Sequence, residues 1–412
     1  MRSPEIVEPT PAAVERALDS GDGLLRLAPT WVPRSFLVPG RRLKLHPRDV
    51  YALGAHRGGI DERWLGSTTP AANEGAPPDE GLSYVVGPDG RFTLRDAIAV
   101  AGERIIGREV MARYGGWPVY AKFFDNLGPI PHHLHQRAAH AAAVGRAPKP
   151  EAYYFPPQLN AQEHRFPYTF FGLEPGTTRE ALRRCLERWA EGDNGVLELS
   201  RAYRLRPGSG WLVPAGILHA PGTLVTYEPQ WASDVFAMFQ SMVEDRPVPW
   251  SLLVKDVPPE HHHDLDYLVD LVDWEANLDP AFKAHHYLEP IPVAPSASEG
   301  YVDRWVVYGR IDGQALLLAR ELTVRPGASL VLRDGAASCL VAVQGRGTLN
   351  GQPVETPVVI RYGELTWDEW FVSAAAAQAG VTVRNTGSED LVLLRYFGPE
   401  TLPDVPEVGT AR

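Results

Sequence analysis

Long apolar segments and cysteine are both scarce in this chain of 412 residues. No apolar run approaches the roughly 20 residues of a membrane-spanning helix, and the first 25 residues lack the apolar stretch of a signal peptide. The two cysteines, Cys185 and Cys339, are far apart and have no CxxC spacing, which disfavours a disulfide framework and a thiolate metal site. We therefore expect a cytoplasmic protein with no membrane partner.

An excess of positive charge is also missing, because the formal net charge is −11 at pH 7. A nucleic-acid partner would need clustered Lys and Arg, and an anionic membrane surface would repel such a chain. A small ligand needs only a local pocket, so a sugar or a sugar phosphate stays open as a partner. The sequence also leaves a homodimer open.

The length favours two domains, and the hydrophobic (44%) and charged (22%) shares are those of a globular protein. Short apolar runs broken by many Gly and Pro residues indicate a mainly β fold of antiparallel barrels. Helical spacing predicts helices over residues 9–20, 93–110 and 177–192. The expected order is an N-terminal helical segment (1–29), a metal-binding barrel domain (30–242), a helical linker (243–295) and a second barrel domain (296–402).

The second barrel region consists of apolar or alternating runs separated by turns. Asn350-Gly351 between two such runs is a strong hairpin signal. The region from 300 to 398 contains no histidine, so we expect it to be free of any histidine-based metal site.

Four residues of the first barrel region form a candidate metal-binding set. His133 and His135 are two residues apart, so both side chains face the same side of a β-strand. Glu151 opens the next predicted strand, and His219 follows a bend at Pro214 and Gly216. Three imidazoles and one carboxylate suit a divalent metal, with zinc favoured, so we predict that the four residues share one ion at a barrel mouth.

Three other histidines are placed outside this set. His132 points to the opposite strand face and is excluded from the ligands. His140 and His164 are candidates for contacting the ligands or the substrate, although a structural role is favoured for both.

In these segments the chain resembles the cupin superfamily, and within it the class I mannose-6-phosphate isomerases. The segment from Glu62 to Ser67, the strand WPVYAKFFDN with Lys122, the tripeptide KPE from Lys149 to Glu151, and VPAGILHA ending beside His219 are similar to family segments and come in the same order. The resemblance implies two or three cupin (jelly-roll) barrels with helical insertions, one bound zinc, and interconversion of mannose 6-phosphate and fructose 6-phosphate. It implies the ligands His133, His135, Glu151 and His219.

The resemblance also implies a mechanism, aldose–ketose isomerisation by proton transfer beside a Lewis-acid metal. A general base would move a proton between C1 and C2 of the sugar. Lys149 and Lys122 match family lysines near the substrate and are the candidate catalytic residues. The cation could lower the pKa of Lys149, and Lys122 could orient the substrate or stabilise an enediolate, while the identity of the general base stays open.

Two departures from the family pattern support other functions. The arginine-containing family segment after the last histidine is replaced by EPQWASDVFAMFQSM, with no arginine before Arg246. That favours a cupin epimerase, lyase or isomerase acting on an unphosphorylated sugar. His133 stands where the family has Gln, and the resulting three-His, one-Glu set is also used by iron-dependent cupin dioxygenases and by enzymes with Mn or Ni. A non-catalytic sugar-binding cupin is the remaining alternative.

Overall fold

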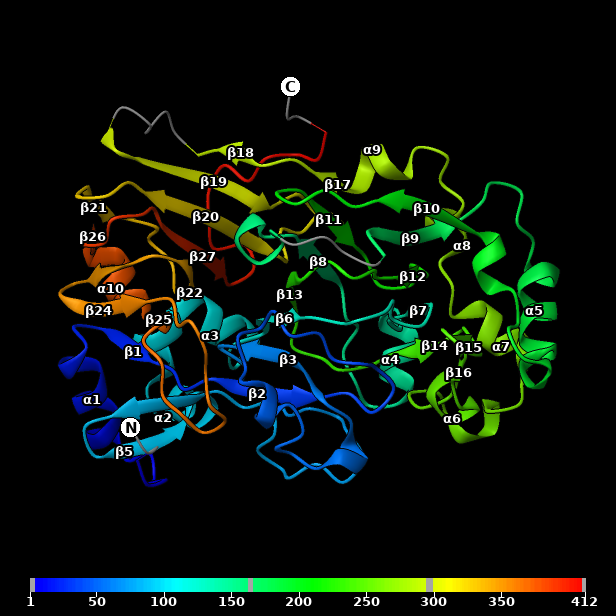
Figure 1. Cartoon of the computed structure of the whole chain (residues 1–412), viewed down its shortest axis with the longest axis horizontal. Helices are drawn as coiled ribbons and strands as arrows, with labels where there is room; N and C mark the ends of the chain where they lie inside the picture. Colours follow the sequence, from blue (N-terminus) through cyan, green and yellow to red (C-terminus); the bar gives the residue numbers. More distant parts are fainter. Residues whose placement is uncertain (1–3, 162–165, 294–298, 410–412) are drawn as a thin grey trace.

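The computed structural model describes residues 4–161, 166–293 and 299–409. The fold is mainly β, with two antiparallel barrels lying side by side and helices gathered at the two ends of the molecule (Figure 1). This arrangement confirms the predicted pair of cupin-type barrels with helical insertions. Among the described residues, every helix is too short or too polar to traverse a lipid bilayer.

The first barrel is built from a seven-stranded and a five-stranded sheet. The larger sheet has the order β17 (Tyr287–Leu288), β11 (Gly210–Val213), β8 (Glu151–Tyr154), β13 (Thr226–Trp231), β6 (Val119–Phe124), β3 (Ile60–Leu65), β2 (Thr30–Pro33). The smaller has the order β10 (Ser200–Arg204), β9 (Tyr168–Leu173), β12 (His219–Ala220), β7 (His133–Leu134), β14 (Ala237–Met238). The inner faces enclose aromatic side chains, among them Tyr153, Phe171 and Trp211.

The second barrel pairs a seven-stranded sheet with a four-stranded one. The larger has the order β1 (Leu24–Arg26), β25 (Glu369–Val372), β22 (Ser338–Gln344), β27 (Leu391–Phe397), β20 (Leu318–Val324), β19 (Tyr301–Val307), β18 (Ile291–Pro292). The smaller has the order β21 (Ser329–Leu332), β26 (Val381–Asn385), β23 (Arg346–Leu349), β24 (Gln352–Glu355). Asn350 and Gly351 have φ of 46° and 81° between β23 and β24, so the predicted two-residue hairpin is confirmed.

Two short hairpins, ten α-helices and six 3₁₀ turns complete the described elements. The hairpins are β4 (Tyr84–Gly87) with β5 (Gly90–Thr93), and β15 (Met242–Val243) with β16 (Arg246–Pro247). The helices are α1 (Pro11–Ser20), α2 (Leu94–Ile106), α3 (Arg108–Tyr114), α4 (Ala138–Ala143), α5 (Arg179–Glu187), α6 (Trp250–Leu253), α7 (Leu265–Asp270), α8 (Trp274–Asn277), α9 (Phe282–His286) and α10 (Ala374–Ala379).

The predicted helices exist, but their ends differ from the prediction. The helix expected over 93–110 is two helices, α2 and α3, because Gly107 between them has φ of 87° and cannot continue the first. The helix expected over 177–192 is α-helical only from Arg179 to Glu187, and a 3₁₀ turn follows. Thr10, Thr93 and Thr178 cap α1, α2 and α5 by accepting a hydrogen bond from a backbone N–H.

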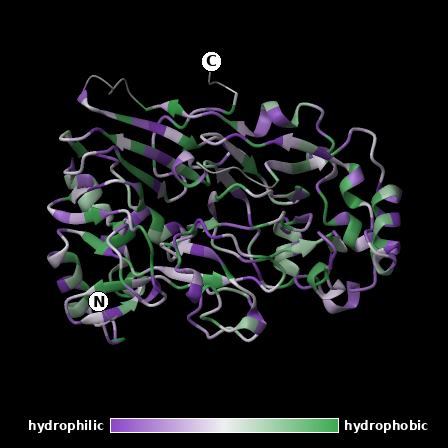
Figure 2. Ribbon diagram, viewed as in Figure 1, coloured by the Kyte–Doolittle hydropathy of each residue, from purple (hydrophilic) through white to green (hydrophobic). Residues whose placement is uncertain are grey.

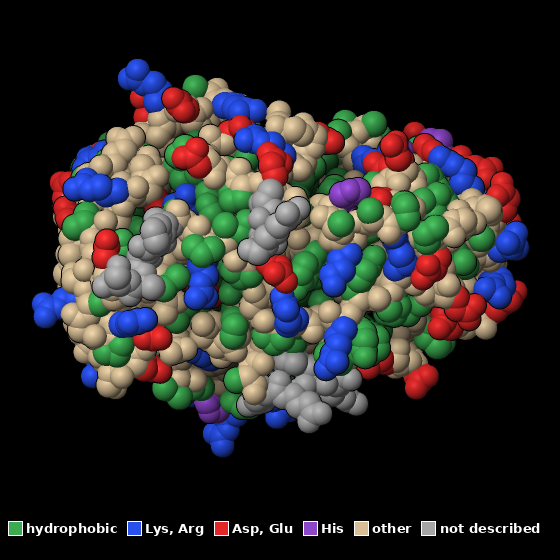
Figure 3. Space-filling model, turned by 90° about the horizontal axis from the view of Figure 1, so that it is seen from above, with side chains coloured by type: hydrophobic (Ala, Val, Ile, Leu, Met, Phe, Trp, Pro, Cys, Tyr) green, Lys and Arg blue, Asp and Glu red, His purple; other side chains and the backbone are tan. Residues whose placement is uncertain are grey.

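Helices α5, α6, α7 and α8 cover the outer end of the first barrel (Figure 1). α5 turns Leu182, Cys185 and Leu186 inward, and Figure 2 shows apolar and polar residues alternating along it. The apolar side of α7, with Leu268 and Val269, belongs to the same buried cluster. Acidic side chains gather on the outside of this end (Figure 3).

Buried ion pairs and strand exchange join the two barrels. β1, from the N-terminal segment, pairs with β25 of the second barrel. Arg63 of β3 donates across the boundary to Asp368 at 2.8 Å and to Glu369 at 3.0 Å. Tyr154 of β8 donates to Glu321 of β20 at 2.8 Å. The strands that carry the first barrel's site are therefore braced from behind by the second barrel.

Candidate metal centre

Three buried histidines of the first barrel converge. His133 in β7 and His219 in β12 are directly opposite each other in the register of the paired strands. His135 follows two residues after His133, and the ring centroids lie 4.1 Å (133–219), 5.2 Å (133–135) and 5.2 Å (135–219) apart. One ring nitrogen of each lies within 4.8 Å of the other two. Within the described ranges this is the only group of three or more such side chains close enough to hold an ion.

The turn before His219 is fixed by a buried asparagine. Gly216 has φ of 89°, and its N–H donates to the carbonyl of His135 at 2.8 Å. Asn277, at the end of α8, donates to the Gly216 carbonyl at 2.8 Å and accepts from the Leu218 N–H at 2.9 Å. These bonds set the direction in which the backbone enters β12, and with it the position of His219.

Each imidazole is oriented by a backbone carbonyl. Nδ1 lies 2.7 Å from the Pro131 carbonyl in His133, 2.7 Å from the Val235 carbonyl in His135, and 2.9 Å from the Ile217 carbonyl in His219. A carbonyl only accepts, so Nδ1 carries the proton in all three rings. Burial lowers the pKa of His133 well below its ordinary value and that of His135 to about 4, so these rings are neutral and their Nε2 atoms carry lone pairs.

Glu151 supplies a carboxylate to the same point. Its Oε2 lies 2.9 Å from Nε2 of His135, and its Oε1 lies 3.1 Å from Nε2 of His219. Burial alone would raise the pKa of Glu151, but the nearby ammonium group of Lys149 holds it well below the usual range, so the group is ionised. The Tyr153 hydroxyl also donates to Oε1.

This donor set fits a divalent cation. A neutral imidazole protonated at Nδ1 offers only a lone pair at Nε2, and a carboxylate oxygen offers only lone pairs. Two such acceptors repel at about 3 Å unless a positive charge lies between them. Lys149 Nζ supplies one to His135 and Glu151, at 3.3 and 3.0 Å, but not to His219. Nε2 of His219 has no hydrogen-bond donor, and each ring is held from behind as metal-binding histidines are. Three nitrogens and one carboxylate are typical of zinc and of other first-row metals.

The two predicted catalytic lysines lie beside this centre, linked by a carboxylate that the sequence pattern did not single out. Lys149 is 3.0 Å from Glu151 and 3.5 Å from Glu228. Lys122 is 3.4 Å from Glu228 and 3.0 Å from Glu62. Burial and the nearby Glu151 raise the pKa of Glu228 to about 8. Burial opposes the charge of Lys122, but Glu228 and Glu62 raise its pKa above the ordinary value, so it stays charged.

A second ion-pair group extends the network. Arg34 lies 3.2 Å from Glu62 and 3.0 Å from Asp234, and all three side chains are buried. Glu228 lies directly opposite Lys122 in the β6–β13 register. Predicting this contact requires knowledge of the strand pairing, which the sequence pattern alone does not supply.

A narrow cavity of about 40 Å³ opens above the histidines. Its polar lining consists of His133, His135, Lys122, Lys149, Arg34, Glu62 and Asp234, and its apolar lining of Phe36, Leu37, Ile130, Phe236 and Met238. A water molecule occupies roughly 30 Å³ of the liquid, so a sugar must displace side chains to enter.

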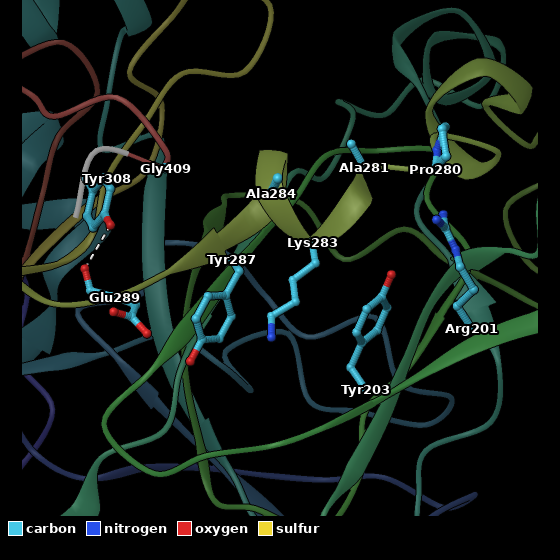
Figure 4. Close-up of a pocket in the computed structure, with 10 residues that line it drawn as sticks. All are labelled: Arg201, Tyr203, Pro280, Ala281, Lys283, Ala284, Tyr287, Glu289, Tyr308 and Gly409. Atoms are coloured by element: carbon cyan, nitrogen blue, oxygen red, sulfur yellow. Dashed lines mark hydrogen bonds between the residues drawn. The ribbon is translucent and has the colours of Figure 1, made fainter. Parts of the chain in front are cut away.

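A larger pocket of about 550 Å³ lies elsewhere, between β10, α9 and β17 (Figure 4). It is lined by side chains that include Tyr203, Lys283 and Tyr287, and its carboxylate Glu289 is paired with Arg206 at 2.6 Å. The residues that line it include no histidine or cysteine.

The remaining histidines lie away from the centre. His132 is buried but turns to the opposite side, where its Nε2 is 2.7 Å from the Ser200 hydroxyl, in agreement with its exclusion from the ligands. His140 in α4 packs edge-on against Tyr267 and lies 3.9 Å from Asp270, so it contacts neither the ligands nor the cavity. His164 lies outside the described residues.

Two cupin-type barrels, one furnished with a histidine cluster, define the architectural class. Solved structures with this architecture include the mannose 6-phosphate isomerase of Bacillus subtilis (17% identity, TM-score 0.59), with 91% of this chain and 99% of that chain covered. A mutant phosphomannose isomerase of Salmonella typhimurium and a zinc-bound mannose 6-phosphate isomerase each share 15% identity and a TM-score of 0.59, over 91% of this chain and 99% of theirs. No protein-family model and no curated protein matches the chain. At such identities the likeness establishes the fold.

Proposed function

We propose that this protein is a metal-dependent sugar isomerase that interconverts an aldose and a ketose by proton transfer. The observation that carries the proposal is the convergence of the three histidine rings and the Glu151 carboxylate beside two buried lysines that share Glu228. Similar solved structures that are named as mannose 6-phosphate isomerases, one of them zinc-bound, add support at the level of the fold.

The proposed ligands are His133, His135, Glu151 and His219, and zinc is the favoured ion. A divalent ion held there would act as a Lewis acid that polarises the carbonyl and hydroxyl oxygens of a sugar. The backbone carbonyls behind the three rings keep each Nε2 directed at the same point, which reduces the reorganisation needed on binding.

The proton transfer is assigned to the lysine–carboxyl–lysine group. A carboxyl with a pKa of about 8 is mostly protonated near neutral pH and still exchanges its proton readily. The ionised fraction of Glu228 can take a proton from the Lys149 ammonium, whose Nζ lies 3.5 Å away on the cavity wall, so that the free amine can take the sugar proton; the Glu228 carboxyl can later return its own. Lys122, which stays charged, stabilises negative charge that develops on a substrate oxygen.

The test is turnover of a panel of free and phosphorylated aldoses by the purified, zinc-loaded protein. Aldose–ketose interconversion should be lost together with bound metal in His135→Ala and Glu151→Ala. It should be lost with metal retained in Lys149→Met. His140→Ala, outside the centre, is the matched histidine control and should keep both metal and turnover. An active His135→Ala protein without metal would disprove the proposal.

A second candidate, an iron-dependent dioxygenase, is favoured by the third imidazole, since His133 completes a three-His, one-Glu set. Stoichiometric iron with substrate-dependent oxygen uptake would establish it. A protein that binds sugar but turns over none of the panel would instead be a binding module.

A further inference from the structure

We propose that the substrate of this metal centre carries no phosphate group: the cavity is built for a neutral sugar whose end remote from the metal is poor in hydroxyls. This inference rests on the proposed function and names the substrate class of the same site. It comes from the ion pairs of the cavity wall and from the side chains that close it.

Every cation that lines the cavity is already paired with buried carboxylates. Arg34 donates to Glu62 through Nε at 3.2 Å and to Asp234 through Nη1 at 3.2 Å and Nη2 at 3.0 Å. The two lysines divide their contacts among Glu62, Glu151 and Glu228, as described above. All of these side chains are nine-tenths or more buried.

A phosphate dianion would have to take one of these cations from its carboxylate. The abandoned carboxylate would keep its neutral hydrogen-bond donors, such as the Ala72 N–H on Asp234, but would be buried without that counter-ion. Such an uncompensated charge costs roughly 3 kcal/mol or more, which corresponds to a factor of at least about 100 in affinity. A neutral sugar imposes no such exchange, because its hydroxyls can donate to the carboxylates in place.

The remainder of the cavity wall is apolar. Phe36 and Leu37 follow β2, and Phe236 and Met238 come from the stretch at β14. The rings of Phe36 and Phe236 both line the cavity and pack against each other with centroids 5.9 Å apart. A sugar that enters must part these rings, and its far end then lies against them, where a C–H or methyl surface is favoured over a charged group.

Two cations just outside the cavity are the candidates for binding a phosphate group if the substrate does carry one. Arg246 donates to the Phe36 carbonyl at 3.5 Å, and no described carboxylate lies within ion-pair distance of it. Lys255 lies behind Phe236, with Nζ 4.0 Å from the ring centroid and 3.6 Å from Asp256. Neither lines the cavity, but Arg246 is the one that a phosphate could recruit if the rings opened outward.

The experiment measures binding by isothermal titration calorimetry on the full-length, zinc-loaded protein. The probes are mannose, 6-deoxymannose and mannose 6-phosphate. The wild-type protein should bind both neutral sugars at least about 100-fold more tightly than mannose 6-phosphate. Asp234→Asn should release Arg34 and narrow this ratio about 10-fold or more. Asp303→Asn removes a buried partner of Arg395 in the second barrel and is the matched control, with the ratio unchanged.

Tighter wild-type binding of mannose 6-phosphate that Arg246→Met abolishes would overturn the inference, as would a failure of all three sugars to bind. If Asp234→Asn does not fold, the affinity ratio of the wild-type protein and the mannose 6-phosphate affinity of Arg246→Met still test the inference. Binding of the neutral sugars without turnover would support this inference while contradicting the proposed isomerisation. A failure of the inference can therefore be told apart from a failure of the proposed function.

Discussion

Asn277 provides a sharp test of how the barrel positions the metal centre. Its side chain is fully buried and bonds both the Gly216 carbonyl and the Leu218 N–H, the two backbone groups that precede His219. Asn277→Ala leaves the Leu218 N–H buried without this partner, whereas the Gly216 carbonyl still accepts from the Asp273 N–H at 3.0 Å. An unpaired buried N–H costs about 1–3 kcal/mol, so we expect the free energy of unfolding to fall by about that amount.

The same substitution should weaken metal binding. Without the side-chain amide, the turn no longer fixes the direction of His219, and loss of such indirect support typically lowers metal affinity by about 10–100-fold. Zinc affinity is measured by competition with a chromophoric chelator, and stability by urea unfolding of the metal-free protein.

Asn160 is the matched control within the same barrel. Its side chain bonds the Val225 carbonyl and N–H, both at 2.9 Å, and is likewise buried, but it has no bond to the histidine-bearing turns. Asn160→Ala should destabilise the protein by a similar amount and leave zinc affinity unchanged. Equal zinc affinities in the two variants would refute the reasoning that Asn277 positions a ligand.

Four further results are expected. The pKa of Glu228 is raised from 4.5 to about 8 in the folded state, so between these pH values the folded protein binds more protons than the unfolded chain. This carboxyl should therefore make the stability of the metal-free protein fall as pH rises from 4.5 to about 8. Glu228→Gln should flatten that part of the plot of urea-unfolding free energy against pH. Tyr153→Phe removes a hydroxyl donor to Glu151 and should lower zinc affinity about 2–10-fold by chelator competition, a smaller loss than typical for metal-supporting residues. Arg63→Met leaves two acidic groups of the second barrel buried without their partner and should cost about 3–5 kcal/mol in urea unfolding; a loss under 1 kcal/mol would contradict the bracing role. Gly351→Ala places a side chain at φ of 81° and should cost about 1–2 kcal/mol without altering zinc affinity.

The parts of the molecule that the sequence predicted well are those specified by local chemistry. The spacing of His133 and His135 places both rings on one side, and the bend at Gly216 returns His219 to them, as the structure shows. Helices form within the predicted ranges 93–110 and 177–192, and Asn350-Gly351 forms its hairpin. That these side chains bind a metal remains the proposal.

The features that the sequence did not predict depend on contacts between distant segments. Arg34 and Asp234 are 200 positions apart and meet only because β2 and the segment before β14 border the same cavity. Glu228 gains its role from strand pairing opposite Lys122. The break at Gly107 was also missed, because the apolar spacing on its two sides continues as if one helix ran through.

The most direct measurement of the central claim is anomalous X-ray diffraction from crystals of the zinc-loaded protein, recorded on both sides of the zinc absorption edge. The account predicts one strong peak about 2.0–2.2 Å from Nε2 of His133, His135 and His219 and from a carboxylate oxygen of Glu151. A peak elsewhere, or none among these side chains in a protein that turns over sugar, would contradict it.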